Sequence, residues 1–81
     1  MNDLQIEYFL AAARNMSFSR AAQELFVSQP AISRQILALE QELGCPLFER
    51  LNRGIMLTAN GEMFYDFFER YRGELFDLKL R

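Results

Sequence analysis

The chain contains only two prolines, and both help to set the limits of one predicted helix. Pro30 follows Ser28 closely, and proline is tolerated in the first turn of a helix because the N–H it lacks would have no partner there. Gly44 suits the left-handed residue after a helix, and Pro46 prevents the helix from continuing. We therefore expect a helix between Ser28 and Gly44, with Ser28 as its N-cap.

Apolar residues mark one face of this helix. Ile32, Ile36, Leu39 and Leu43 follow one another at steps of four, three and four residues. This spacing predicts a single buried stripe. The polar residues Gln29, Ser33, Arg34 and Gln35 lie mostly off the stripe, so one face is expected to pack in a core while the other remains free.

The remaining segments predict a mostly α-helical chain with a small hairpin. Apolar spacing indicates helices at about residues 4–14 and 18–25, with Ser17 or Ser19 as the cap of the second. Asn52 and Gly54 separate two short apolar runs, which favours a β-hairpin at about residues 47–57. Thr58 is expected to cap a last helix, at about residues 59–80.

This order of elements is the winged helix-turn-helix plan, followed by a long helix. We expect the helix-turn-helix at about residues 18–37 and the hairpin to be its wing. Residues 1–58 are then the DNA-binding domain, and residues 59–81 are a linker or dimerisation helix.

Composition excludes several classes of function. The chain has no histidine and one cysteine, Cys45, and its four glycines form no phosphate-binding motif. We therefore expect no enzyme activity, no cofactor and no metal site, and we interpret Cys45 as a packed thiol. No apolar run approaches the roughly 20 residues of a membrane span. The N-terminus lacks the basic region of a signal peptide, so the default expectation is a cytoplasmic protein that contacts no membrane.

The first turns of the third helix carry side chains suited to DNA. In this fold the third helix enters the major groove and its N-terminal residues meet base edges. Gln29 can pair with adenine, and the fork of Arg34 matches guanine. Because the net charge is −2, affinity for DNA must come from a few well-placed groups rather than from a basic surface.

Several blocks of the sequence resemble the DNA-binding domain of LysR-type transcriptional regulators. They are Phe18 to Ile36, Leu39-Glu40, Leu43-Gly44, Pro46 to Arg50, and Leu57-Thr58 with Gly61. The resemblance implies base or phosphate contacts for Ser28, Gln29, Pro30, Ser33 and Arg34, and a backbone or minor-groove contact for Arg53. Arg50 is expected either to contact DNA or to hold the wing to the domain. A small-molecule inducer is implied only if the full protein carries a C-terminal effector domain.

An aromatic stripe on the last helix predicts a second partner. Phe64, Phe67, Phe68, Tyr71 and Leu75 share one face, which would aggregate if left exposed. A second copy of the helix, packed about a two-fold axis, would cover it, although the stripe could instead pack on its own domain. The family resemblance also implies a homodimer, which would bind two related half-sites arranged as an interrupted inverted repeat.

One alternative comes from a different functional class. A winged helix can also bind a protein groove with its exposed helix, and the acidic pI of about 5.0 slightly favours this function. The polar tip with Gln29, Ser33 and Arg34 argues against it, because a protein-binding face is more often apolar at its centre.

Overall fold

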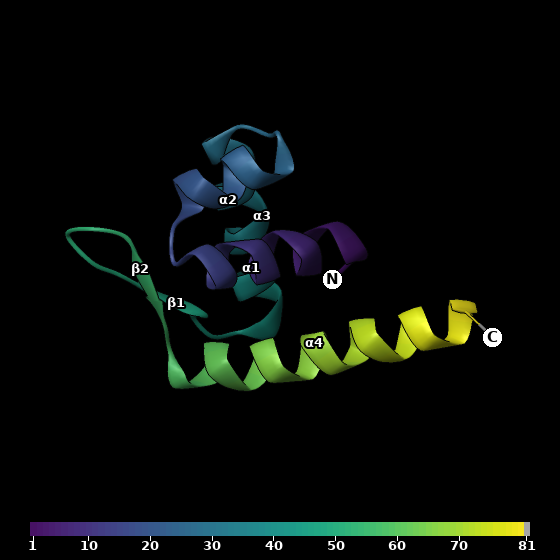
Figure 1. Cartoon of the computed structure of the whole chain (residues 1–81). Coiled ribbons are helices and arrows are strands. Elements are labelled where there is room, and N and C mark those ends of the chain that lie inside the picture. Colours follow the sequence, from purple (N-terminus) through teal and green to yellow (C-terminus); the bar gives the residue numbers. More distant parts are fainter. Residues whose placement is uncertain (81) are drawn as a thin grey trace.

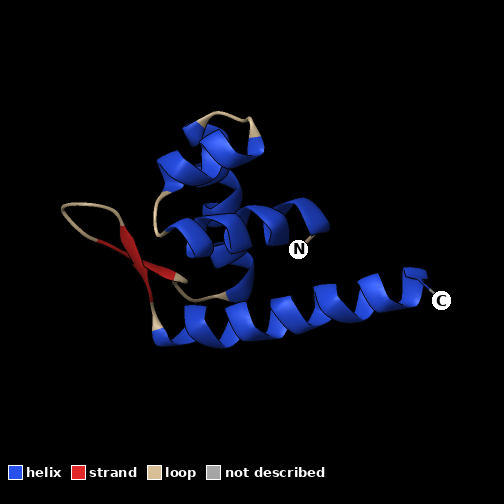
Figure 2. Cartoon of the chain, in the orientation of Figure 1, coloured by secondary structure: helices blue, strands red, loops and turns tan. Residues whose placement is uncertain are grey.

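A computed structural model describes the backbone of residues 1–80 and the side chains of residues 1–72. Its elements are α1 (Asp3–Asn15), α2 (Phe18–Leu25), α3 (Gln29–Leu43), β1 (Phe48–Arg50), β2 (Ile55–Leu57) and α4 (Ala59–Leu80). In Figure 1, α1, α2 and α3 form one group, α4 runs along one side of it, and the hairpin projects from the group. Figure 2 shows how small the β part is. The predicted mostly helical, winged helix-turn-helix plan is confirmed.

Each of the first three helices begins after a polar residue whose side chain caps it. The side chain of Asn2 caps α1, and Ser17, rather than Ser19, caps α2 by accepting from the N–H of Arg20 at 3.1 Å. Ser28 caps α3 as predicted, because its Oγ accepts from the N–H of Ala31 at 3.2 Å. The helix ends at Gly44, whose φ of +77° lies in the left-handed region that favours glycine.

The core is built around α1, which packs against α2, α3 and α4. Phe9 of α1 is fully buried, and its ring centroid lies 5.4 Å from that of Phe48 and 5.8 Å from that of Phe68. These tilted and edge-to-face arrangements suit the charge distribution of aromatic rings. Phe9 therefore joins α1, the wing and α4 in one hydrophobic cluster.

The stripe of α3 packs into this core as the sequence predicts. Ile32, Ile36 and Leu39 are completely buried, and Leu43 is partly buried at the edge of the core. Burial of this face fixes α3 against α1 and leaves the opposite face free.

The wing is an antiparallel pair of short strands. Phe48 pairs with Leu57, Glu49 with Met56 and Arg50 with Ile55. The loop between them closes through a hydrogen bond from the N–H of Leu51 to the carbonyl of Gly54 at 3.1 Å. Gly54 has a φ of +83°, and an added Cβ would lie 3.0 Å from the carbonyl oxygen of Met16, so the loop packs closely against the connection between α1 and α2.

A polar cluster joins the end of α1 to α2. Glu24 accepts from the amide of Asn15 at 3.1 Å and from the guanidinium of Arg14. These two bonds, that of Asn15 first, hold the pKa of Glu24 below its usual value. The two bonds join the last turn of α1 to the last turn of α2.

The aromatic stripe of α4 divides into two rows, which corrects one prediction. Phe68 is only 1% exposed and packs against Phe9. The sequence predicts that Phe68 faces a partner. Phe68 belongs instead to the core of its own domain. Phe64 stacks on Phe68 at 5.8 Å and is partly buried in the same cluster. The alternative that the stripe packs on its own domain is therefore correct for this inner row.

The outer row of α4 faces solvent. Met63, Phe67 and Tyr71 are 57%, 56% and 41% exposed, and their spacing of four residues places them along one side of the helix. Leu75, which the sequence predicts in the same interface, lies outside the residues whose side chains are described.

In the part of the chain that the structure describes, no helix is long and apolar enough to cross a membrane.

Gly61 sits where α4 crosses the loop before the wing. A Cβ at this position would lie 2.0 Å from the carbonyl oxygen of Leu47, so Gly61→Ala must push the two segments apart. We expect this substitution to lower the free energy of unfolding by about 1–3 kcal/mol. Urea denaturation at a fixed protein concentration measures the change, with Asn60→Ala at a neighbouring exposed position as the control. Equal midpoints for the two variants would contradict this close contact.

Candidate nucleic-acid interface

The N-terminal tip of α3 projects from the domain. Ser28, Gln29, Pro30 and Arg34 are exposed, while Ser33 is partly buried. Pro30 lies in the first turn, where its missing N–H costs no hydrogen bond. The five predicted residues of α3 and its cap are thus brought together at one end of the helix, and none of them is buried in the protein's own interior.

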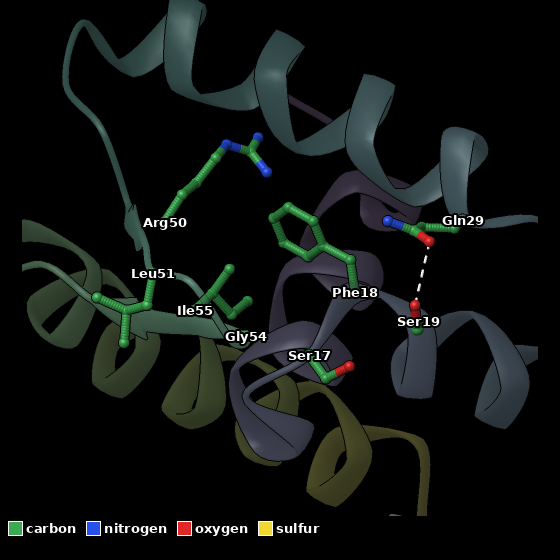
Figure 3. Close-up of a pocket in the computed structure, with 8 residues that line it drawn as sticks. All are labelled: Ser17, Phe18, Ser19, Gln29, Arg50, Leu51, Gly54 and Ile55. Atoms are coloured by element: carbon green, nitrogen blue, oxygen red, sulfur yellow. Dashed lines mark hydrogen bonds between the residues drawn. The ribbon is translucent and has the colours of Figure 1, made fainter.

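Gln29 is held by the start of α2. The Oγ of Ser19 donates to Oε1 of Gln29 at 3.1 Å, which joins the first turn of α2 to the first turn of α3. Figure 3 shows this bond and places the Nε2 group of Gln29 on the opposite side of the amide. The hydrogen bond therefore fixes which end of the amide can donate to a ligand.

Ser33 and Arg34 differ in how they are held. The Oγ of Ser33 donates to the carbonyl of Gln29 at 3.0 Å, so the Ser33 proton is committed to its own helix and the oxygen remains an acceptor. Within residues 1–72, the guanidinium of Arg34 has neither a hydrogen bond nor an ion pair with the protein. Its five N–H donors are available to an external acceptor.

Arg50 is placed both to hold the wing to the domain and to contact an anion. Its Cζ is 4.8 Å from the centroid of the Phe18 ring, which is a cation–π contact. This contact joins the first strand of the wing to the start of α2. It supports the prediction that Arg50 holds the wing to the domain, while the exposure of the side chain leaves donors free for an anion.

An open cleft of about 260 Å³ separates the tip of α3 from the wing. It is lined by Ser17, Phe18, Ser19, Gln29, Arg50, Leu51, Gly54 and Ile55 (Figure 3). Hydroxyl, amide and guanidinium groups line this cleft together with apolar side chains. Arg53 is exposed in the wing loop, between the two strands.

The sequence did not predict two members of this arrangement. Ser19 was expected only as a possible cap, and no contact with the wing was expected for Phe18. Both roles depend on the crossing of α2 with α3 and the wing, which no local spacing reveals. Among the described residues, no group of cysteine, aspartate and glutamate side chains is placed to hold a metal ion.

The fold and the exposed tip define a winged helix-turn-helix domain. The family described as "bacterial regulatory helix-turn-helix protein, lysR family" matches residues 4–62, and the chain belongs to this family. The predicted resemblance is thus confirmed.

Two curated relatives illustrate the similarity. The transcriptional regulator BudR of Klebsiella aerogenes is 54% identical over 61 residues, which are 75% of this chain and 43% of BudR. The glycine cleavage system transcriptional activator of Escherichia coli K12 is 51% identical over 65 residues, which are 80% of this chain and 21% of the activator. Both relatives are named as regulators of transcription, and this chain spans less than half the length of either.

Solved structures give the same result. The DNA-binding domain of BenM in its complex with catB site 1 DNA has a TM-score of 0.92 and 36% identity, covering 96% of this chain and 88% of that one. The CbnR DNA-binding domain in its complex with DNA has a TM-score of 0.84 and 40% identity, covering 100% of both chains. The described backbone therefore has the fold of these LysR-type DNA-binding domains.

The hydrogen bond between Ser19 and Gln29 predicts an ordered amide. Ser19→Ala removes the donor, so the Gln29 side chain should become mobile and its amide order parameter should fall below about 0.6. NMR relaxation of the side-chain amide measures the effect. Ser19→Thr keeps the hydroxyl and should retain most of the order. Equal order in the wild type and in Ser19→Ala would mean that Ser19 does not hold the amide.

Proposed function

We propose that this chain binds double-stranded DNA in a sequence-specific manner, with the tip of α3 in the major groove. One observation carries the proposal. The inner face of α3 is fixed in the core by Ile32, Ile36 and Leu39, while Gln29 and Arg34 stand exposed at its free end. A rigid rod with an amide and a guanidinium at its tip matches the donor and acceptor pattern of base edges.

Each exposed group has an expected partner. Gln29 pairs with adenine and Arg34 with guanine, while Pro30 is a small apolar contact for a thymine methyl group. Ser28 donates its hydroxyl proton to a phosphate or accepts from a base. Ser33 accepts from a base donor while its own proton stays on the carbonyl of Gln29, and it donates to a phosphate only when that bond is exchanged. Ser28 keeps its capping bond in this role, because that bond uses only one of its lone pairs.

The wing gives the second part of the proposed interface. Arg53 reaches the sugar-phosphate backbone or the adjacent minor groove from the loop. Arg50 contributes to the same side of the cleft, next to Phe18. The two similar structures are complexes with DNA, and this supports the same class of ligand here.

The proposed active form is a homodimer in the cytoplasm of a bacterium. The outer row of α4, with Met63, Phe67 and Tyr71, is the described part of the proposed interface. Phe64 contributes from its edge, and Leu75 is proposed for the same interface from its spacing in the sequence alone. Residues 1–58 then bind DNA. The helix at 59–81 both completes the core and pairs the two copies, which matches an interrupted inverted repeat.

The alternative of a protein-interaction module is not favoured. The tip of α3 is polar, whereas the centre of a protein interface is depleted in charge. The curated relatives are also regulators of transcription. Recognition of an inducer is proposed only for a longer protein that carries an effector domain.

Arg34 provides the direct test of DNA recognition. We expect Arg34→Ala to cost about 1–3 kcal/mol of binding free energy and to relax preference at one base position. The measurement is a titration of duplexes selected from a random pool, repeated at several salt concentrations, because phosphate contacts make the affinity fall steeply with salt. Arg72→Ala removes the same charge from an exposed site on α4 and is the control. Binding that is insensitive to salt, or an equal loss on every sequence, would contradict base recognition by α3.

The outer row of α4 is tested by Phe67→Glu. A buried carboxylate without a partner is costly, so this variant should raise the dimer dissociation constant at least about tenfold. Sedimentation equilibrium measures the change, and binding to a single half-site should be preserved. Leu37→Glu places the same charge at an exposed apolar position of α3 and is the control. Phe67→Glu that sediments as an unchanged dimer would exclude this face as the interface.

A further inference from the structure

Glu40 accepts hydrogen bonds from the backbone N–H groups of the loop that follows α3. Its carbonyl accepts from the N–H of Gly44 at 2.8 Å and from that of Cys45 at 3.2 Å. Its Oε2 accepts from the N–H of Leu47 at 2.7 Å and from that of Phe48 at 3.3 Å. Because proline has no N–H, one residue binds every backbone N–H between positions 44 and 48.

The position of this carboxylate is unusual for a helix. Glu40 lies in the last turn of α3, where the partial negative charge of the helix end disfavours an acidic side chain. The two backbone donors from the loop offset this cost, because hydrogen bonds to a charged group are stronger than those between neutral groups. The side chain is therefore placed to hold the loop and not to stabilise the helix.

The same loop also holds the end of the wing and the start of α4. The N–H of Thr58 donates to the carbonyl of Leu47 at 3.0 Å, and the Oγ1 of Thr58 donates to the carbonyl of Pro46 at 2.7 Å. Oγ1 of Thr58 in turn accepts from the N–H of Gly61 at 2.9 Å. A continuous set of hydrogen bonds thus runs from the carboxylate of Glu40 through the loop to β2 and α4.

Both proposed DNA-contacting elements meet at this junction. The tip of α3 carries Arg34, and the wing loop carries Arg53. The wing has only two strands of three residues each, and so small a sheet has little stability of its own. Apolar contacts of Phe48 with Phe9 and the contact of Arg50 with Phe18 hold the wing to the domain. The bond pair from Leu47 and Phe48 to Glu40 is the direct polar link between the start of the first strand and α3.

We propose that Glu40 is a positioning residue that sets the wing relative to α3, so that Arg53 and the α3 tip engage one DNA segment together. This inference rests on the proposed function, since it concerns how two parts of that interface are coupled. Glu40 itself contacts no DNA. Its side chain acts through the backbone of residues 47 and 48.

The first measurement is independent of DNA. In Glu40→Ala the amides of Leu47 and Phe48 lose their acceptor, so their hydrogen exchange should accelerate at least about tenfold, while amides in the middle of α1 keep their protection. Glu40→Gln keeps a neutral oxygen acceptor and should retain part of the protection. Glu42→Ala removes an equal charge from the same helix and is the control, because Glu42 pairs with the N-terminal amine of Met1 and not with the wing.

The second measurement is a double-mutant cycle on DNA. In the wild type, Arg53→Ala and Arg34→Ala should each weaken binding about tenfold or more. In the Glu40→Ala background, the effect of Arg53→Ala should shrink to less than about threefold, while the effect of Arg34→Ala stays the same. A general loss of stability would alter both effects alike, so the difference between the two cycles reports the position of the wing. If Glu40→Ala does not fold, Glu40→Gln is used for the same cycles and should show a smaller change in the same direction.

The outcomes separate this inference from the function on which it rests. Unchanged exchange at Leu47 and Phe48 in both Glu40 variants would overturn the role of Glu40 while leaving DNA binding intact. Additive effects of Glu40→Ala and Arg53→Ala would do the same. If Arg53→Ala has no effect in the wild type while Arg34→Ala does, the wing contact of the proposed function fails, and the positioning role fails with it.

Discussion

The burial of one face of α3 is the constraint on which the rest of the molecule depends. Ile32, Ile36 and Leu39 are completely enclosed, and each such side chain contributes roughly 1.5–3 kcal/mol relative to an exposed one. Because these residues lie on one face of the helix, the residues before them and on the opposite face, including Gln29 and Arg34, stay exposed. The same packing that stabilises the domain therefore determines that its polar tip stands in solvent.

Phe9 extends this arrangement to the wing and to α4. Its ring touches those of Phe48 and Phe68, so three elements that are distant in sequence meet at one side chain. The hydrogen bonds of Glu40 and Thr58 lie at the edge of this cluster and fix the chain between the elements. In physical terms, the apolar contacts hold the elements together and the polar ones set their directions.

Much of the fold could be predicted because the residues that begin and end its helices act through local hydrogen bonds. Ser28, Gly44 and Thr58 cap or end helices through bonds within a few residues, and their observed roles match those expected. The prediction for Phe68 was wrong for a physical reason. Helical spacing shows that a long helix has apolar residues around much of its circumference, but it does not show which row meets the protein's own core.

The candidate site was predictable in its residue types but not in its supports. Gln29 and Arg34 were found from their place at the start of a helix and from their hydrogen-bonding groups. The bond from Ser19 to Gln29 and the stacking of Arg50 on Phe18 both connect separate elements. Such contacts depend on crossing angles, which a sequence pattern does not contain.

The two rows of α4 have a consequence for how this helix can vary in length. The inner row is locked to the domain by Phe64 and Phe68, and the outer row follows from it at a fixed angle. An α-helix turns by about 100° per residue, so a single inserted residue near Gly61 would rotate the core-facing row toward solvent. Natural variation in this segment should therefore favour substitutions over insertions and deletions.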